Sequence, residues 1–414
     1  MSSDLDRLDI ISNDTYARNG YPHEAWTRLR REAPLHWNTH QIDVPFWAVT
    51  KHADIVWISK QPSRFLNGPR LAAFPELQPP EGGSPLRHLL NMDPPDHAAF
   101  RKLASHRFTP RGLERMRRDI ETITADLLDA MMGDGGVQEG DFVEKLSAPL
   151  PLQVLAELLG VPRDMWPTMF DWTNRMIGSS DPEYQEAGDS AAATANKARL
   201  SMFAYFADLN RERIARPSDD IVSVIANAKI DGASLPDKEL LSYYLLLVVA
   251  GNETTRNAMT GGLLAFAENP EQWKRLREDP ELVDSAVEEV VRWTTPVIQF
   301  CRTAAADVEI RGKKVRAGEH LCLFYPSANR DEEVFDDPFA FRIDRKPNRH
   351  IAFGIGEHFC LGANLARLEL RVVFRHLASR LAEFELAGPV ERLRSSFVGG
   401  IKRMPIRYRL DPAR

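Results

Sequence analysis

Apolar residues recur with the spacing of one helix face through the middle of the chain, from about residue 97 to residue 290. This periodicity predicts helices over 98–106, 111–132 and 152–159. The alanine-rich segment 190–215 consists of good helix formers and is predicted to be helical as well. Helices therefore dominate the predicted fold.

Short alternating runs of β-branched and aromatic residues predict strands near both ends of the chain. The predicted strands are 35–37, 46–50, 308–310, 320–324 and 407–410. No repeat or low-complexity linker divides the sequence, and small sheets built from both ends require those ends to pack together. We therefore expect a mainly α fold with small β-sheets, organised as a single domain over residues 1–414.

One long helix stands out in this pattern. We expect Ser234 to cap a helix that continues to Glu268, roughly 32 residues or ~48 Å at 1.5 Å per residue. Residues 245–250 are apolar on all sides, so the middle of this helix is predicted to be buried. Gly251 costs about 1 kcal/mol relative to alanine there, and a buried carboxylate at Glu253 is costly without a partner. Such breaks of local preference are typical of functional sites.

Composition and charge narrow the class of protein. The chain has 43% apolar and 27% charged residues, close to an average soluble globular protein. Its 53 basic and 59 acidic residues give a net charge of −6, which argues against a nucleic-acid-binding protein. The N-terminus lacks the apolar core of a signal peptide, and the most apolar stretch, 240–251, is shorter than the about 20 residues of a membrane span. We expect a cytoplasmic monomer without a membrane span.

The three cysteines are too few and too irregularly spaced for a disulfide framework, and they favour a reducing compartment. Cys301 and Cys322 are interpreted as core residues. Cys360 differs, because residues 353–362 read F-x-x-G-x-x-x-C-x-G and lead into a predicted helix. The glycines permit a tight turn, and the dipole and free amides of a helix N-terminus stabilise a thiolate placed before it.

The segment around Cys360 resembles the haem-ligand loop of the cytochrome P-450 family, the haem-thiolate monooxygenases. The resemblance covers about residues 20–410. It implies that Cys360 is the proximal thiolate ligand of the iron of haem b. It also implies the family's fold, a mainly helical triangular prism with small sheets around the buried haem.

Glu289 and Arg292 match the family's E-x-x-R pair, at positions i and i+3 of a helix. The family often adds a third basic residue from a P-x-x-F segment. Ala340 stands at that place here, which leaves Arg342 and Arg345 as alternatives for the third partner.

Residues 250–254 match the oxygen-activation segment of the family's long central helix. The small pair Ala250 and Gly251 implies space for dioxygen beside the helix. Glu253 and Thr254 match the family's acid–alcohol pair, which implies that they deliver the two protons needed for O–O cleavage. General acid catalysis of this kind is typically worth roughly 100- to 10,000-fold, and a thiolate ligand adds the electron push.

Four further positions match residues that bind haem carboxylates in the family. His97 and Arg101 share one helix face, Arg302 lies in the segment after the E-x-x-R pair, and His358 precedes Cys360 by two residues. Buried carboxylates need such cationic partners. A basic cluster near them predicts a docking patch for an acidic ferredoxin. It comprises Arg101, Lys102, Arg107, Arg111, Arg115, Arg117 and Arg118.

The family's substrate contacts come from the loop before His97, the central helix, the segment after the E-x-x-R pair and a C-terminal turn. The loop, residues 67–95, is rich in glycine and proline. These segments are largely apolar here, which predicts a hydrophobic substrate such as a terpenoid, an aromatic compound or a steroid. The predicted contacts are Leu247, Ala250, Gly251, Val297, Gln299 and Phe397, with Gln299 and Ser396 as alternative polar anchors.

The resemblance implies a monooxygenase that inserts one atom of O2 into a C–H bond, with electrons from NAD(P)H through ferredoxin reductase and ferredoxin. One alternative is a peroxide-driven peroxygenase, but such members usually lack the acid–alcohol pair. Another is a non-enzymatic haem-thiolate sensor, which needs no proton relay and usually carries a signalling domain. A zinc protein is disfavoured, since no C-x-x-C pairs accompany Cys360 and His358.

Overall fold

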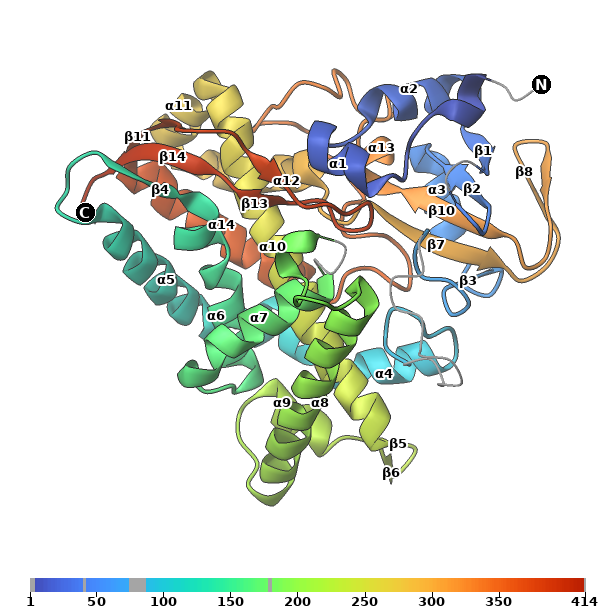
Figure 1. Ribbon diagram of the computed structural model, residues 1–414, viewed down its shortest axis with the longest axis horizontal. Helices are drawn as coiled ribbons and strands as arrows, with labels where there is room; N and C mark the ends of the chain where they lie inside the picture. Colours follow the sequence, from blue (N-terminus) through green and yellow to red (C-terminus); the bar gives the residue numbers. More distant parts are fainter. Residues whose placement is uncertain (1–3, 40–41, 74–86, 178–180, 413–414) are drawn as a thin grey trace.

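Helices dominate the structure, as the hydrophobic periodicity predicts (Figure 1). The computed structural model describes residues 4–39, 42–73, 87–177 and 181–412. The helices are α1 (Asn13–Asn19), α2 (His23–Glu32), α3 (His52–Ser59), α4 (Asp96–Ser105), α5 (Pro110–Met132), α6 (Pro149–Leu159), α7 (Trp166–Ile177), α8 (Ala191–Ala215), α9 (Ile221–Ala226), α10 (Asp237–Glu268), α11 (Pro270–Glu278), α12 (Val283–Thr294), α13 (Tyr325–Ala328) and α14 (Ala363–Arg380).

Local capping explains where several helices begin. The Thr109 hydroxyl accepts from the Gly112 amide at 3.1 Å before α5, and the Ser190 hydroxyl accepts from the Ala193 amide at 3.2 Å before α8. The long helix α10 has 32 residues, as predicted. The prediction of Ser234 as its cap is wrong, because Pro236 occupies the cap position and Ser234 pairs in a short hairpin.

Strands from the N-terminal and C-terminal parts of the chain form the largest sheet of the described residues. The strands are β1 (Leu35–Asn38), β2 (Phe46–Val49), β3 (Phe65–Leu66), β4 (Gln138–Asp141), β5 (Lys229–Ile230), β6 (Ala233–Ser234), β7 (Gln299–Ala304), β8 (Val308–Ile310), β9 (Lys313–Val315), β10 (His320–Phe324), β11 (Leu381–Leu386), β12 (Glu391–Arg392), β13 (Ile401–Arg403) and β14 (Pro405–Leu410). One sheet has the order β1-β2-β10-β7-β3 and the other β11-β14-β4. Parallel pairing of β2 with β10 joins N-terminal to C-terminal segments directly.

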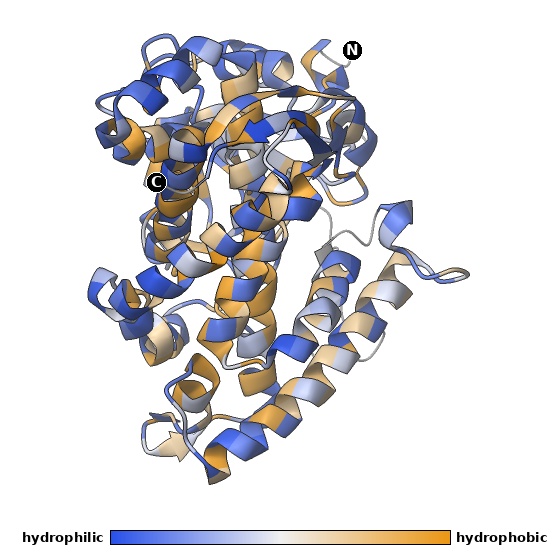
Figure 2. Ribbon diagram, turned by 90° about the vertical axis from the view of Figure 1, so that its left-hand side faces the viewer, coloured by the Kyte–Doolittle hydropathy of each residue, from blue (hydrophilic) through white to orange (hydrophobic). Residues whose placement is uncertain are grey.

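Helix α10 lies at the centre and packs against α6, α7, α8, α12 and α14. Apolar residues concentrate on the inner helices, while the outer helices turn polar faces to solvent (Figure 2). Besides its apolar core, α10 buries polar residues, among them Asn252, Glu253 and Arg256. None of the described helices combines the length and the apolar character that a membrane span requires.

Candidate active site

A cavity lies between α4, α10, the segment leading into β7, and the turn before α14. It contains about 1590 Å³ of empty space, counting the part open to solvent. Its walls are mostly apolar, with Leu246 and Leu247 from α10 and Val297 and Phe300 from the β7 segment. The cavity therefore favours a large, mainly hydrophobic occupant.

The turn before α14 presents Cys360 to this cavity. Gly354 (φ 69°) and Gly356 (φ 80°) both adopt the left-handed conformation that favours glycine. A Cβ atom on Gly356 would collide with the backbone oxygen of Ser59. The Cys360 amide donates to the Phe353 carbonyl at 2.8 Å and closes the turn. The turn therefore has the conformation that its two glycines predict.

Opposing effects act on the Cys360 thiol, which forms no disulfide. Burial raises the pKa of the thiol. The amides of Gly362 and Ala363 and the charges of Arg101 and Arg367 act in the opposite direction, because each stabilises a negative sulfur. In the protein alone the effect of burial is the larger one and favours the neutral thiol. The neighbouring amides and arginines are nevertheless placed to stabilise a thiolate.

The structure brings together the four residues matched to haem carboxylates, since His97, Arg101, Arg302 and His358 all line the cavity with Cys360. The rings of His97 and His358 stack at 4.0 Å between centroids. His97 Nδ1 lies 3.2 Å from a carboxylate oxygen of Glu357. The other ring nitrogen, Nε2, is buried without a hydrogen-bond partner among the described residues.

Burial disfavours positive charge on three of these four side chains, His97, Arg302 and His358. Burial lowers the pKa of His97 and of Arg302. Burial, with the neighbouring charge of Arg302, lowers the pKa of His358 to about 2. The histidines are therefore neutral at pH 7, and the two arginines supply the positive charge. A buried anion between them would relieve the cost of burying that charge.

One face of α10 forms another wall, through Leu247, Ala250, Gly251 and Thr254. The Thr254 hydroxyl donates to the Ala250 carbonyl at 2.8 Å, one helical turn earlier. Its oxygen keeps lone pairs that accept further hydrogen bonds. These four residues lie together as their helical spacing predicts.

Glu253 is not among the residues that line the cavity. Its side chain is fully buried on another face of α10, where it forms an ion pair with Arg256. Arg256 also donates to the Asn174 side-chain oxygen at 3.3 Å. Burial raises the pKa of Glu253, and Arg256 partly offsets that rise. Adjacent residues on a helix point about 100° apart, so sequence adjacency does not bring this acid to the alcohol.

Some of the predicted substrate contacts line the cavity and others do not. Val297 lines the cavity, whereas Gln299 and Phe397 are not among its described lining residues. Gln299 is buried, and its side-chain oxygen accepts from the Ala73 amide at 3.2 Å, so the predicted polar anchor serves the backbone. Phe397 packs edge-on against Phe300, which lines the cavity, at 5.6 Å between ring centroids.

The sequence analysis missed several polar lining residues, among them Asn67, Tyr325 and Glu369. The Asn67 side-chain nitrogen lies 2.7 Å from His358 Nε2 and 3.3 Å from the Asp93 carboxylate. Burial raises the pKa of Glu369 well above its ordinary value. Only Glu369 had a local signal, as a carboxyl group within the apolar spacing of α14.

The structure decides between the two alternatives for the third partner of Glu289 and Arg292. Arg292 donates twice to the Glu289 carboxylate, at 2.7 and 2.8 Å. The Arg345 side chain also reaches this carboxylate, at 3.1 Å. Arg342 contributes only its backbone amide, at 2.9 Å. Arg345 is therefore the third basic partner, and all three side chains of the network are buried.

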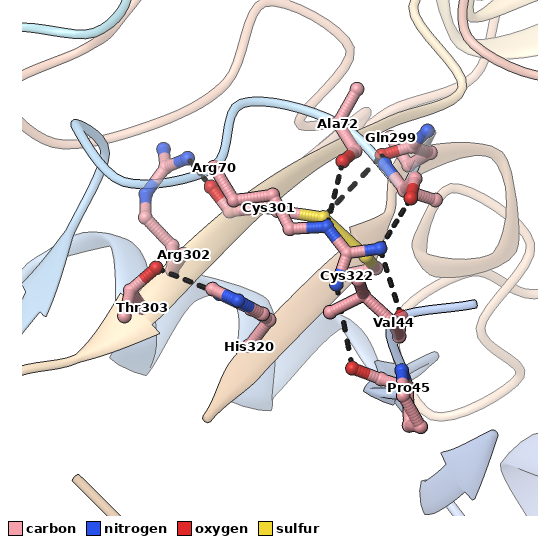
Figure 3. Close-up of a disulfide and its surroundings, with 11 residues drawn as sticks. Val44, Pro45, Arg70, Ala72, Gln299, Cys301, Arg302, Thr303, His320 and Cys322 are labelled. Carbon is pink, nitrogen blue, oxygen red and sulfur yellow. Dashed lines mark hydrogen bonds between the residues drawn. A yellow bond between two sulfur atoms is a disulfide. The ribbon is translucent and has the colours of Figure 1, made fainter. Parts of the chain in front are cut away.

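The expectation that the cysteines form no disulfide is wrong for Cys301 and Cys322 (Figure 3). These residues face each other on the antiparallel strands β7 and β10, with Cα atoms 4.2 Å apart. Both are completely buried, which confirms their interpretation as core residues. Sequence spacing missed the pair because strand register, not chain distance, makes them neighbours.

Known proteins of similar sequence and structure identify the family. Residues 141–397 match the family model described as "Cytochrome P450". The steroid C26-monooxygenase of Mycolicibacterium smegmatis is 38% identical over 98% of this chain and 94% of that protein. The linalool 8-monooxygenase of Pseudomonas putida is 36% identical over 97% of this chain and 99% of that protein.

A solved structure agrees with these matches. The cytochrome P450 CYP268A2 of Mycobacterium marinum, in complex with pseudoionone, superposes with a TM-score of 0.89. The two are 35% identical, and the superposition covers 97% of this chain and 98% of the other. The predicted fold is thereby confirmed. The chain belongs to the cytochrome P-450 family and is a haem-dependent monooxygenase.

Proposed function

We propose that this monooxygenase inserts one atom of O2 into a C–H bond of a hydrophobic terpenoid, aromatic or steroid-like molecule. Electrons come from NAD(P)H through a ferredoxin reductase and a ferredoxin, and residues 1–414 act as one domain. The observation that carries the proposal is an unpaired Cys360 on the wall of an apolar cavity that also contains two arginines and Thr254. When bound, the haem supplies the iron centre at which dioxygen is activated.

The residues around Cys360 fit a haem. Buried propionate groups need hydrogen-bond donors and positive charge. His97 offers a buried, unpartnered ring nitrogen. Arg101 and Arg302 line the cavity, and burial lowers the pKa of Arg302, so an anion beside it is favoured. We assign the binding of the propionates to these three residues and to His358.

Cys360 is the iron ligand in this proposal. The amides that follow it and the charges of Arg101 and Arg367 favour its thiolate. A metal cation at the sulfur adds to that preference and outweighs the cost of burial, because a coordinating thiol is deprotonated. The left-handed glycines of the turn hold the sulfur on the cavity wall.

Thr254 and Glu253 handle protons in two different places. The Thr254 hydroxyl is anchored to the Ala250 carbonyl, so its oxygen is held in the cavity as an acceptor for an incoming proton donor. Glu253 lies on another face of α10, where burial raises the pKa of its carboxyl group and Arg256 partly offsets that rise, and we assign it the role of relaying protons towards Thr254. The ion pair with Arg256 holds the carboxyl group outside the cavity.

A hydrophobic substrate follows from the lining. The walls beside Thr254 consist of Leu246, Leu247, Val297 and Phe300, with Leu71 from the loop segment. Part of that loop, residues 74–86, lies outside the described residues. The similar proteins support the same chemistry, since their names include a steroid and a terpene alcohol as substrates.

A ferredoxin docking patch is supported by the free members of the basic cluster. Arg107 and Arg115 both pair with Asp219, each at 2.6 Å, so one of their two positive charges is balanced. Lys102, Arg111 and Arg118 are exposed. They form no ion pair within the described part of the chain, so they remain available to an acidic partner.

The experiment that tests the proposal is a visible spectrum of the reduced, CO-bound protein, followed by titration of the ferric protein with hydrophobic compounds. We expect the Soret band from which the family takes its name, and spin-state shifts with terpenes or steroids. Product analysis with a ferredoxin and its reductase then identifies the hydroxylated compound. A CO spectrum typical of histidine ligation would refute the role of Cys360.

A further inference from the structure

The segment 70–73, called the wall segment here, supplies Leu71 to the cavity. It belongs to no helix or strand. Other apolar lining residues, among them Leu247 of α10, Phe300 of β7 and Leu365 of α14, lie in elements whose positions are fixed by regular backbone hydrogen bonding. The position of Leu71 depends instead on contacts that side chains make with the backbone of the wall segment.

Arg70 fixes the wall segment from one side (Figure 3). Its Nε donates to the Ala72 carbonyl at 3.1 Å, and one terminal nitrogen donates to the Ala73 carbonyl. The guanidinium also donates to the carbonyls of Val44, at 3.0 Å, and Pro45, at 3.4 Å. Arg70 therefore joins the wall segment to the loop before β2 through four backbone oxygens.

Gln299 and Cys301 of strand β7, both labelled in Figure 3, also hold the wall segment. The buried Gln299 accepts from the Ala73 amide at 3.2 Å. The Cys301 amide donates to the Leu71 carbonyl at 2.7 Å. Cys301 and Gln299 are almost fully buried, so water does not replace these contacts readily.

We propose that Arg70 and Gln299 are positioning residues that determine which hydrophobic substrates the cavity accepts, by holding Leu71 in its wall. This inference rests on the proposed function. An apolar pocket selects by shape, and a single methylene group changes selection by about 10- to 200-fold. A displacement of Leu71 therefore alters the relative affinity for slim and bulky substrates.

The chemistry of the contact requires arginine rather than any cation. The four acceptors of Arg70 are carbonyl oxygens from two separate segments. A planar guanidinium reaches them together, whereas a lysine ammonium is a compact point charge on a flexible stem. Arg70→Lys therefore keeps the positive charge but removes the planar set of hydrogen-bond donors. The variant thus tests the donor geometry separately from the charge.

The experiment compares Arg70→Lys, Gln299→Met and Leu71→Ala in the haem-loaded protein. Dissociation constants for linalool, pseudoionone and testosterone are measured from the spin-state shift, together with the thermal midpoint. We expect both positioning variants to change the linalool-to-testosterone ratio by about fivefold or more. The matched control is Arg64→Lys, since the side chain of the exposed Arg64 contacts Gln61 and the Trp57 ring rather than the wall segment; its linalool-to-testosterone ratio should stay within about twofold.

A double-mutant cycle shows whether Arg70 acts through Leu71. If it does, the Arg70→Lys effect on the ratio largely disappears in the Leu71→Ala background. An unchanged ratio in both positioning variants, or an effect that adds fully to that of Leu71→Ala, overturns the inference while the proposed function stands. A wild-type spectrum that responds to none of the three compounds or related terpenes and steroids refutes the proposed function, and the inference with it.

Discussion

Replacing Arg345 by methionine tests the energetic role of the buried network around Glu289. The Glu289 carboxylate is completely buried, with two hydrogen bonds from Arg292 and contacts of 3.1 and 3.2 Å to Arg345 Nε. Removing one partner of a buried ion pair costs about 3–5 kcal/mol. Because Arg292 stays in place, we expect the lower end, about 3 kcal/mol.

The backbone contacts of Arg345 keep the cost from falling far below this value. Its terminal nitrogens donate to three carbonyl oxygens of the segment before it, which methionine leaves without that donor. These acceptors are Asp336 at 2.6 Å, Asp337 at 3.1 Å and Ala340 at 2.8 Å. Urea unfolding of the haem-loaded protein, followed by tryptophan fluorescence, measures the change in the free energy of unfolding.

Arg342→Met is the matched control, because Arg342 reaches Glu289 only through its backbone amide. We expect this variant to cost less than about 1 kcal/mol. Equal losses in the two variants, or a loss below about 1 kcal/mol for Arg345→Met, would contradict the assignment of Arg345 as the third partner.

The pH dependence supplies an independent check. Burial raises the pKa of Glu289, but hydrogen bonds and charge from Arg292, with Arg345, outweigh it and hold the pKa below the ordinary value of 4.5. A carboxyl group with a depressed pKa stabilises the fold above its unfolded pKa, and this stabilisation is lost as the pH falls through the folded pKa. The difference in the free energy of unfolding between wild type and Arg345→Met should therefore reach its full size near pH 7. It should shrink below about pH 4.5. A constant difference down to lower pH would refute the reasoning.

Three further predictions concern the site and the cysteines. Thr254→Ala should keep the CO spectrum but divert reducing equivalents to peroxide or water, measured as product formed per NAD(P)H consumed; unchanged coupling would exclude a proton-handling role for Thr254. Cys360→His should bind haem without the thiolate signature of the CO complex, and a persisting signature would show that another residue is the ligand. Alkylation of the unfolded chain should label one cysteine without reductant and three after reduction. Replacing Cys301 and Cys322 together by alanine should lower the free energy of unfolding by about 3 kcal/mol, as expected for a sequence separation of 21 residues; three labelled cysteines without reductant would show that the disulfide does not form.

Much of the fold was determined by sequence, because helices follow from local periodicity. The apolar spacing located α4, α5 and α6 within a few residues and gave the length of α10, while the alanine-rich composition located α8. The error at Ser234 arose at a helix start, where a capping side chain competes with strand pairing that no local pattern reveals.

The turn around Cys360 was also determined locally. Its two glycines permit the left-handed backbone conformation that the turn requires, and the helix that follows begins at Ala363. Spacing on one helix likewise placed Ala250, Gly251 and Thr254 on a shared wall. Motifs whose chemistry depends on a few neighbouring residues can therefore be read from sequence.

Tertiary structure alone decided which distant groups meet. Arg345 rather than Arg342 reaches Glu289, and Gln299 bonds the backbone of Ala73 rather than facing the cavity. Cys301 meets Cys322 through strand register. In each case the partner is set by how separate elements pack, and the buried polar groups then take the partners that this packing brings within hydrogen-bond distance. Local spacing carries no information about that choice, which is why the sequence determined the elements and the ligand turn while the packing determined the partners.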